Sequence, residues 1–188
     1  MRNLVVTEYV TLDGVMEDPG GGEKGGHGGW SGPFWSEEAS RFKYDELFAA
    51  DALLLGRITY QGFAQAWPNM QGTGDFGERM NGMAKYVVSS SLKQLDWNNS
   101  HLITGDIAQA VSNLKQLPGQ DILVEGSAQL VSLLLQHDLV DEYRLMVHPI
   151  VVGGGKRLFP EGDQRKTLKL ASSRPFSSGI IVLSYRPG

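Results

Sequence analysis

Residues 53 to 60, Leu-Leu-Leu-Gly-Arg-Ile-Thr-Tyr, combine the residue types that can bind an anion. An apolar run, typical of a strand covered on both faces, stops at Gly56, and a polar, helix-forming segment follows it. The free N–H groups at the start of such a helix attract phosphate. Arg57 adds a fork of donors, and Thr59 adds a hydroxyl in the first turn. Taken alone, this stretch fits better with a glycine that ends a strand beside a solvated arginine, because short motifs often match by chance.

A second turn of the same kind lies at residues 125 to 128, Glu-Gly-Ser-Ala. It follows a short apolar strand, Ile122 to Val124, and precedes an apolar helix. Gly126 has no side chain to block a ligand, Ser127 is a small hydroxyl, and the backbone N–H groups that begin the helix face the turn. Two such turns indicate a dinucleotide held across neighbouring strand ends. Neither turn matches GxGxxG, and the chain has no GxxxxGK[ST] phosphate loop.

Small polar residues also follow two other predicted strands. Asp13 stands at a turn after the strand from Leu4 to Leu12, where open α/β sheets place ligands. It is a candidate substrate-contacting carboxylate, although an Asx turn before Gly14 is the commoner explanation. Ser89 and Ser90 follow a strand that begins at Lys85. Their hydroxyls can bind a phosphate or a ribose, or simply form a serine-rich turn.

The segment from Asp18 to Gly32 contains eight glycines and predicts a mobile surface loop. His27 lies inside it without a metal-ligand spacing to other residues, so we expect an exposed residue with no function. Aromatic side chains follow at Trp30, Phe34 and Trp35. They can form the lid and wall of a pocket for a flat ring, or anchor the loop into the core, and both interpretations stay open.

Strands and helices alternate through most of the chain, and a β-rich tail follows. This order predicts an α/β sheet with antiparallel strands at one edge. Asn69 to Gly82 is expected to be a second polar, glycine-containing excursion that covers the same face as the Asp18 to Gly32 segment. The expected helices are Ser36 to Ala50 with Ser36 as N-cap, a helix after Thr59 that ends near Ala66 before Trp67-Pro68, Ile107 to Leu117 and Gln129 to Gln136. The remaining expected strands are Ala52 to Leu55, Lys85 to Ser89, His101 to Thr104, Asp141 to Val152, and the pair Lys166 to Ala171 and Gly179 to Tyr185, joined by Ser172 to Ser178.

Length and composition favour a single domain over residues 1–188 and exclude several protein classes. The absence of cysteine excludes disulfides and thiolate sites and fits a reducing cytoplasm. A net charge of −4 gives no general attraction to nucleic acid or to an anionic membrane. The first residues contain no compact apolar stretch followed by a small-residue cleavage site, so no signal peptide is expected, and no apolar run approaches membrane-spanning length. We therefore expect a soluble, cytoplasmic protein that binds a small molecule.

Five segments, in this order, resemble the dihydrofolate reductase fold, and more closely the reductase domain of bacterial riboflavin biosynthesis. That resemblance implies a three-layer sandwich with a mixed, mostly parallel central sheet, helices on both faces and an antiparallel C-terminal edge. It also makes a homodimer plausible. The segments are Thr11-Leu12-Asp13-Gly14, Leu55-Gly56-Arg57-Ile58-Thr59-Tyr60, Lys85-Tyr86-Val87-Val88-Ser89-Ser90, Val124-Glu125-Gly126-Ser127, and His148-Pro149-Ile150-Val151-Val152-Gly153-Gly154-Gly155.

The same resemblance implies an NADPH-dependent reductase without a metal. The nicotinamide would lie against the first strand, with the substrate between Asp13, the glycine-rich loop and the Ser36 helix. Asp13 is then the candidate catalytic residue, to orient substrate or relay a proton, with Glu17 and Asp45 as weaker candidates; Trp30 and Trp35 are candidate substrate contacts. The implied cofactor-binding residues are Gly56, Arg57 and Thr59 for phosphates, Ser89 and Ser90 for the adenosine 2′-phosphate or ribose, and Gly126, Ser127, Ala128 and Gln129 for the pyrophosphate.

This sequence departs from the pattern of the folate-reducing members at a position that bears on the substrate. Folate-reducing members carry a pterin-binding carboxylate on the helix before the phosphate turn, where this chain has Ser40; Glu37, Asp45 and Glu46 are displaced along the helix. Dihydrofolate is therefore not the expected substrate. The resemblance then implies a hydride acceptor that is a small heterocycle, pterin-like or 5-amino-6-ribosylaminouracil-like, with the physiological substrate unassigned. The alternatives are an NADP(H)-binding regulatory module without turnover, and a structural protein on a borrowed fold.

Overall fold

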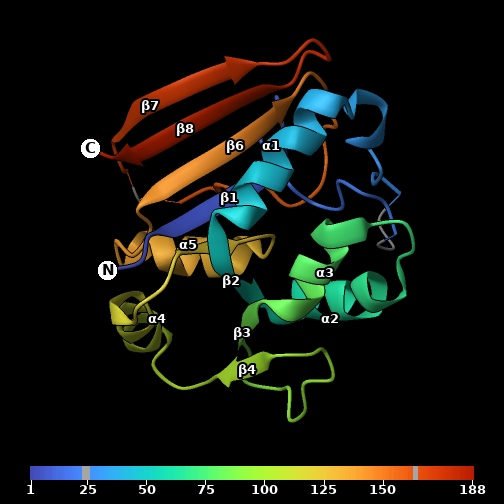
Figure 1. Cartoon of the computed structure of the whole chain (residues 1–188). Helices are drawn as coiled ribbons and strands as arrows, with labels where there is room; N and C mark the ends of the chain where they lie inside the picture. The colour runs from blue at the N-terminus through green and yellow to red at the C-terminus, as the bar shows by residue number, and fades with distance from the viewer. Residues whose placement is uncertain (23–25, 163–164) are drawn as a thin grey trace.

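One eight-stranded sheet organises the chain, in the order β4-β3-β2-β5-β1-β6-β8-β7 (Figure 1). The structure, a computed structural model, describes residues 1–22, 26–162 and 165–188. The six strands from β4 to β6 in this spatial order, β4-β3-β2-β5-β1-β6, run parallel to one another. Strand β8 pairs antiparallel with both β6 and β7. The strands are β1 (Leu4–Thr11), β2 (Ala50–Gly56), β3 (Ala84–Val88), β4 (Ser100–Ile103), β5 (Asp121–Val124), β6 (Glu142–His148), β7 (Leu168–Pro175) and β8 (Ile181–Pro187).

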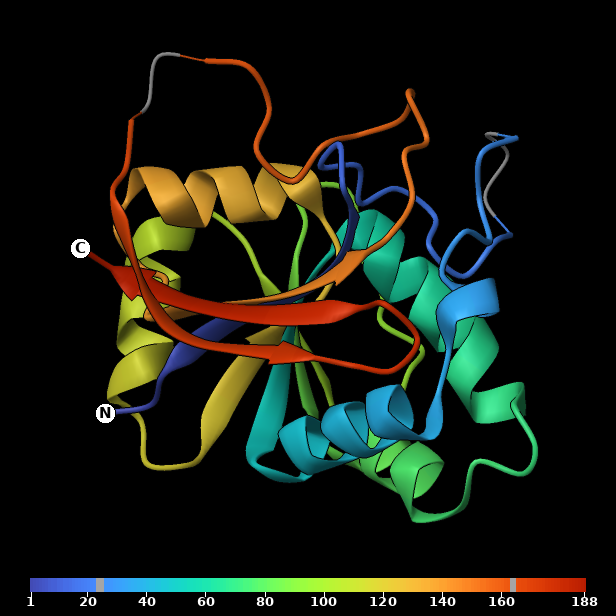
Figure 2. The same cartoon turned by 90° about the horizontal axis from the view of Figure 1, so that it is seen from above.

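Helices cover both faces of this sheet, as the view from above shows (Figure 2). On one face α4 (Ile107–Gln116) and α5 (Ala128–Gln136) pack against Val6, Leu54 and Val124. On the other face α1 (Glu37–Phe48), α2 (Arg57–Ala66) and α3 (Gly74–Gly82) pack on the alternate side chains of the same strands. The predicted three-layer α/β sandwich with an antiparallel C-terminal edge is confirmed.

The central strands explain why the sheet has this order. Residues 4 to 7 of β1 and 52 to 56 of β2 are all buried, as are Ile122 to Val124 of β5. Such continuously apolar strands are stable only when both faces are covered, so they occupy the middle of the sheet. At the opposite end β7 is exposed along nearly its whole length, as expected of an edge strand.

The helix ends follow from local side-chain chemistry. The Ser36 side chain accepts a hydrogen bond from the Ala39 N–H at 3.2 Å, which confirms the predicted cap of α1. Asp106 caps α4 in the same way through the Gln109 N–H, at 3.0 Å. Helix α2 ends at Ala66 and passes into the short 3₁₀ helix η2 (Trp67–Asn69), because Pro68 cannot continue an α-helix.

Three predicted segments differ from the structure. The second part of the excursion from Asn69 to Gly82 forms α3, a helix that was not predicted. Its Phe76 and Met80 lie one turn apart and pack on the core. The predicted strand from Asp141 to Val152 ends at His148, since Pro149 lacks the N–H that a strand needs. The last hairpin is longer than predicted: β7 extends to Pro175 and the connection shrinks to residues 176–180.

Two loops lie together beyond the carboxyl end of β1. Val15 and Arg157 form an isolated antiparallel bridge, and the Met16 N–H donates to the Lys156 carbonyl at 2.9 Å. The glycine-rich segment follows this contact in the chain. Its His27 is exposed, as predicted, whereas Gly25 of that segment lies outside the described residues. Among the helices of the described residues, none is long and apolar enough to cross a membrane.

Candidate cofactor and substrate site

The two predicted phosphate turns meet at the carboxyl ends of the adjacent strands β2 and β5. The Gly56 N–H donates to the Ser127 hydroxyl at 3.0 Å, and the hydroxyls of Thr59 and Ser127 lie 2.9 Å apart. Gly56 and Gly126 are both required where the two turns come into contact. A Cβ at Gly56 would overlap Ser127 Oγ, and one at Gly126 would lie 2.6 Å from Thr59 Oγ1. The two turns therefore form one continuous surface.

Helices α2 and α5, which start at these turns, begin without a side-chain cap. Their N-cap residues are Gly56 and Ser127, and neither side chain bonds to the first turn. Helices α1 and α4 are capped, whereas α3 is uncapped but does not follow a strand end. The first-turn N–H groups of an uncapped helix need an acceptor, and an anion supplies one. The donor set thus fits the pyrophosphate of a dinucleotide.

Ser127 adopts a left-handed backbone conformation with φ of 65°, directly after Gly126 with φ of 66°. The other non-glycine residues with positive φ in the described chain are Asp18, Asn99 and Asp138. Asp and Asn tolerate this region through local hydrogen bonds, whereas a serine there carries more strain. Strained residues concentrate at functional sites, where the surrounding contacts enforce the conformation.

The remaining predicted cofactor residues follow the sheet edge towards β3. Arg57 is exposed on the first turn of α2, with Nη1 3.1 Å from Gln61 Oε1, and can reach a ligand. Ser90 is exposed, but Ser89 is buried, and its hydroxyl accepts hydrogen bonds from the Ser91 and Leu92 N–H groups. Ser89 thus shapes the turn. On α5, Ala128 is half-buried and Gln129 is exposed.

Asp13 lies at the end of β1, and its carboxylate binds the loop after β6. It accepts hydrogen bonds from the Thr11 hydroxyl at 2.6 Å and from the Val152 and Gly153 N–H groups at 3.2 and 2.9 Å. The Thr11 and backbone hydrogen bonds lower the pKa of Asp13 to about 2. An ionised carboxylate with these partners can orient a neighbouring group. It holds no proton to donate near neutral pH.

The predicted aromatic residues take two different positions. Trp30 is buried, donates its indole N–H to the Glu17 carbonyl at 2.9 Å, and packs edge-on against His148 with ring centres 5.1 Å apart. It therefore anchors the glycine-rich loop. Trp35 is 45% exposed and contacts Tyr9 of β1 edge-on, with ring centres 6.0 Å apart. Trp35 presents a free aromatic surface at this end of the sheet.

Between α1 and β1 lies a buried ion network that the sequence did not predict. The Lys43 ammonium lies 2.6 Å from Glu46 and 3.0 Å from Glu125, and donates to Thr7 Oγ1 at 3.2 Å. Burial opposes the charged form of Lys43, but the two carboxylates outweigh it and raise the pKa well above the usual value. A usable signal was present: Ala39, Lys43, Glu46 and Leu47 share the inward face of α1, and Glu125 directly precedes the glycine turn.

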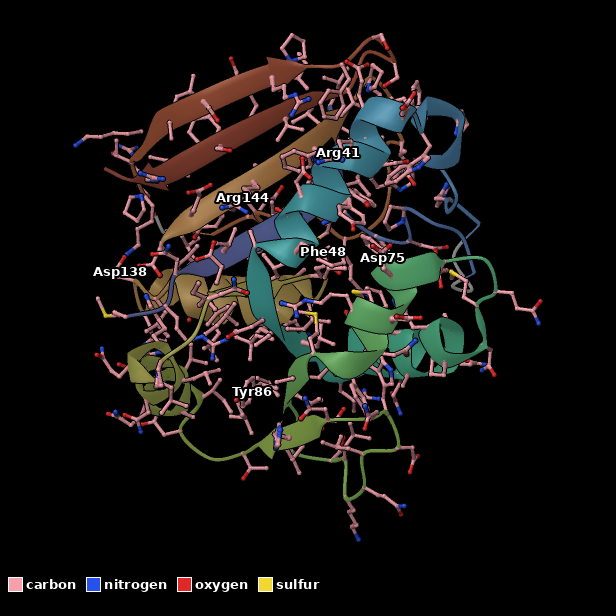
Figure 3. The ribbon with its side chains drawn as sticks, in the orientation of Figure 1. Arg41, Phe48, Asp75, Tyr86, Asp138 and Arg144 are labelled. Atoms are coloured by element: carbon pink, nitrogen blue, oxygen red, sulfur yellow. The ribbon has the colours of Figure 1, made fainter. Side chains whose placement is uncertain are left out.

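The network extends to the neighbouring strand β6. Arg144, labelled in Figure 3, lies 3.4 Å from Glu46 and 2.7 Å from Glu142. Glu46 is thus shared by two cations, whereas Glu125 contacts Lys43 and its side chain is 16% exposed. Glu125 is the member of the network that lies beside the Gly126 turn and reaches solvent.

The other polar residues considered on and near α1 face away from the network. Ser40 and Glu37 are exposed, and Ser40 donates to the Ser36 carbonyl on its own helix. Asp45 forms an exposed ion pair with Arg41, 2.9 Å apart. Glu17 binds Lys156 at 2.9 Å, at the loop contact beyond β1.

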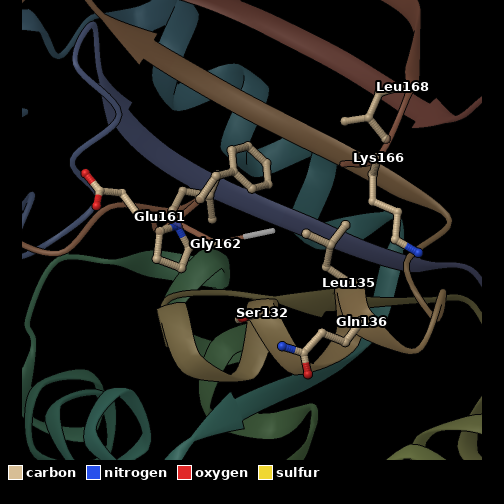
Figure 4. Close-up of a pocket in the computed structure, with 10 residues that line it drawn as sticks. Ser132, Leu135, Gln136, Glu161, Gly162, Lys166 and Leu168 are labelled. Atoms are coloured by element: carbon tan, nitrogen blue, oxygen red, sulfur yellow. The ribbon is translucent and has the colours of Figure 1, made fainter. Parts of the chain in front are cut away.

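A pocket of about 260 Å³ opens elsewhere, between the second half of α5 and residues 158–162, 166 and 168 (Figure 4). It contains none of the predicted site residues. Its lining includes Ser132, Leu135, Phe159, Glu161 and Lys166.

The family model of the RibD C-terminal domain matches residues 2–182. The chain belongs to the RibD C-terminal domain family. This chain is similar to the uncharacterized protein YyaP of Bacillus subtilis (strain 168), with 32% identity over 187 residues, which cover 98% of this chain and 94% of YyaP.

Two solved structures match over almost their whole length. A putative riboflavin biosynthesis protein from Shewanella sp. PV-4 superposes with a TM-score of 0.76 at 18% identity, covering 100% of this chain and 99% of that one. Dihydrofolate reductase from Enterococcus faecalis, complexed with NADP(H), superposes with a TM-score of 0.65 at 13% identity, covering 99% and 96%. At these identities the likeness establishes the fold, and the predicted resemblance to both groups is confirmed.

Proposed function

We propose that this RibD C-terminal domain protein is an NADPH-dependent reductase that transfers hydride to a small heterocyclic substrate. The observation that carries the proposal is the junction of two uncapped helix starts, α2 and α5, through Gly56, Thr59 and Ser127. Family membership and the reductase folds among the similar structures support the same conclusion.

Different residues of the chain would bind different parts of the cofactor. The first-turn N–H groups of α5, at Ala128 and Gln129, would bind the pyrophosphate, and those of α2 would bind the adjoining phosphate. Arg57 and Ser90 are exposed on the β2 and β3 side and would contact the adenosine 2′-phosphate. When bound, NADPH supplies the hydride, and the protein supplies position and electrostatic environment.

The substrate would lie beyond the end of β1, on the α1 face. Trp35 would stack against a flat ring. Glu125, which forms an ion pair with Lys43 at 3.0 Å, would accept hydrogen bonds from ring N–H or amino groups. Asp13 would fix the loop at residues 152–153 beside the substrate. A heterocycle rich in donors, pterin-like or aminouracil-like, matches these acceptors better than an anionic substrate does.

A homodimer is part of this proposal as an expectation from the family. The exposed edge strand β7, with Leu170 56% exposed, offers unpaired backbone groups for association. Size-exclusion chromatography with light scattering measures the assembly state directly.

NADPH oxidation with a panel of pterins, aminouracil nucleosides and quinones tests the proposed activity. We expect acceptor-dependent oxidation by the wild type and its loss in Gly126→Ala. Binding of NADPH without turnover on any acceptor would instead favour a regulatory module. Absence of both binding and turnover would remove the reductase proposal and leave the fold.

A further inference from the structure

Tyr9 lies in the second half of β1, on the strand face that α1 covers. Thr7 shares this face and donates a hydrogen bond to Glu46 of α1 at 2.8 Å. Tyr9 is half-buried, and within the described residues its hydroxyl forms no hydrogen bond. The same oxygen is not fully buried, so solvent reaches it. The protein therefore leaves this donor free for a ligand.

The ring of Tyr9 connects the two parts of the proposed substrate site. It contacts the exposed Trp35 edge-on, with ring centres 6.0 Å apart. The Lys43 ammonium lies 5.6 Å from the centre of the same ring. Lys43 in turn lies 3.0 Å from the carboxylate of Glu125, which precedes the Gly126 turn. An aromatic surface, an ammonium and a carboxylate thus surround a phenol whose hydroxyl is unoccupied.

Two other titratable side chains near the end of β1 are poor sources of a proton for a substrate. Asp13 is ionised near neutral pH, and its oxygens accept hydrogen bonds from Thr11 and Gly153. His148 packs edge-on against Tyr9 with ring centres 5.6 Å apart, but it is fully buried. A substrate at the surface of the sheet therefore cannot touch the His148 ring.

Reduction of a C=N or C=O group requires a proton as well as a hydride. The carbon receives the hydride that NADPH supplies, and the double-bond electron pair passes to the nitrogen or oxygen. That atom must then take a proton from a donor in contact with it. A neutral phenol can give this proton, and the phenolate that remains can recover one from water.

We propose that Tyr9 is a catalytic residue whose phenolic hydroxyl protonates the nitrogen or oxygen of the reduced group. Lys43 stabilises the phenolate as it forms, because its ammonium is held beside the ring in a site of low polarity. The inference rests on the proposed reductase function and supplies the proton donor that this function needs.

The groups around Tyr9 keep its proton in place until a substrate requires it. Burial raises the pKa of Tyr9 above its usual value of 10, and Lys43 opposes this effect only in part. Three carboxylates add to the effect of burial: Glu125 after β5, Glu46 of α1 and Glu8 of β1 itself. From β6 the facing titratable group is His148, whose pKa burial lowers, so its ring is neutral near neutral pH. Tyr9 is therefore a neutral donor across the neutral range.

The first test compares wild type and Tyr9→Phe in NADPH oxidation with pterins, aminouracil nucleosides and quinones. Phenylalanine keeps the ring and loses the hydroxyl, so we expect kcat to fall about 100-fold or more with no change in the Kd of NADPH. Thermal melts establish that the variant is folded. Wild-type turnover by Tyr9→Phe would overturn the proposal, as would a loss of rate that follows from weaker NADPH binding alone.

Tyr185→Phe is the matched control. Tyr185 is a half-buried strand tyrosine of β8, and within the described chain its hydroxyl also forms no hydrogen bond. It pairs with Tyr143 near the start of β6, at the opposite end of the sheet from the proposed site. This variant should turn over like wild type. An equal loss of rate in both variants would contradict a specific role of Tyr9.

The second test measures the protonation state of Tyr9 without any acceptor, from the tyrosinate absorption of wild type minus that of Tyr9→Phe. We expect no difference signal at neutral pH and almost none at pH 10, where an unperturbed phenol is half-ionised. A tyrosinate signal at neutral pH would overturn the proposal, because a phenolate has no proton to give.

The two tests also separate this inference from the proposed function. Wild type that reduces no acceptor on the panel removes the proposed function and the catalytic assignment with it, whatever the titration shows. Wild type that is active, together with a Tyr9→Phe variant that is equally active, removes the assignment of Tyr9 alone.

Discussion

At the scale of single residues, Arg57 is the side chain on which cofactor selectivity depends. It is exposed at the start of α2, and its side chain donates a hydrogen bond to the neutral Gln61. Arg57→Ala should raise the Kd of NADPH about tenfold and change that of NADH by less than about twofold, because a guanidinium–phosphate contact is lost only with NADPH. Parallel titrations with both nucleotides check this. Equal weakening of the two would contradict a role in 2′-phosphate binding.

Arg41→Ala supplies the control for that measurement. Arg41 is an exposed arginine on α1, paired with Asp45 at 2.9 Å, and lies outside the proposed site. Its removal alters the net charge by the same amount as Arg57→Ala. Both nucleotides should therefore bind Arg41→Ala as they bind wild type.

Asp13 gives a second prediction at this scale. Asp13→Asn keeps the shape of the side chain but removes the charge that two backbone N–H groups share. Those hydrogen bonds weaken, so the amide hydrogens of Val152 and Gly153 should exchange faster with solvent while NADPH affinity is unchanged. Unaltered exchange at both amides would show that the charge does not hold the loop.

Residue types in the sequence indicated the chemistry but not which groups were already engaged. The sequence identified Asp13 as a carboxylate at a strand end, but the loop that binds it lies 139 residues away in the sequence. Likewise, Ser127 was identified as a hydroxyl for phosphate, whereas its side chain joins α5 to the start of α2. Local sequence carries no information on such distant partners.

At the scale of elements, the junction of α2 and α5 depends on glycine at two positions. Gly126→Ala adds a Cβ 2.6 Å from Thr59 Oγ1 at a φ of 66°, so we expect loss of NADPH binding and a destabilisation of about 1–3 kcal/mol. NADPH titration and urea denaturation measure the two effects. Normal binding by this variant would argue against the turn as the pyrophosphate site.

Gly62→Ala is the matched control within the same structure. Gly62 lies in the interior of α2, and a Cβ there meets nothing within 4 Å. Alanine is the better helix former, so this variant should be more stable by about 0.5–1 kcal/mol and should bind NADPH normally. A loss of binding here would mean that α2 tolerates no change at all.

Elements with strong local signals were predicted correctly, and those set by tertiary packing were not. Ser36 caps its helix as expected, because a cap is a contact within four residues. Helix α3 was missed because three glycines obscure its pattern, although Gly77 is needed where a Cβ would overlap Thr73. Packing of Phe76 and Met80 on the core outweighs the low helix propensity.

At the scale of the whole molecule, Lys85 should make stability depend on pH. It is fully buried at the start of β3, donates to the Asn81 and Asn98 carbonyls, and burial lowers its pKa from 10.5 to about 8. Between these two values the unfolded chain binds more protons than the folded one. The free energy of unfolding therefore gains a contribution that rises with pH from about 8 to 10.5.

Urea denaturation of wild type and Lys85→Met across that range isolates this contribution. The stability of wild type relative to Lys85→Met should increase with pH, because the variant has no group to titrate at this position. Other titrating residues cancel in the difference. A difference that is constant from pH 8 to 10.5 would contradict the lowered pKa.

The order of motifs predicted the architecture of the whole molecule, because each one marks a strand end at the same edge of the sheet. The ion network beneath α1 was not predicted, although the helical spacing of Lys43 and Glu46 places both on the inward face of α1. Its hydrogen bonds join Lys43 to Thr7 and Glu125, 36 and 82 residues apart, so only the folded sheet brings the groups together. The substrate end of the proposed site lies near this network, and it is therefore the part of the site that sequence patterns predicted least.

The central claim is that the α2–α5 junction binds NADPH, and calorimetric titration of the purified protein tests it most directly. The account predicts a single class of sites that binds NADPH in preference to NADH, with binding lost in Gly126→Ala and kept in Gly62→Ala. No binding of either nucleotide by folded wild-type protein would contradict it.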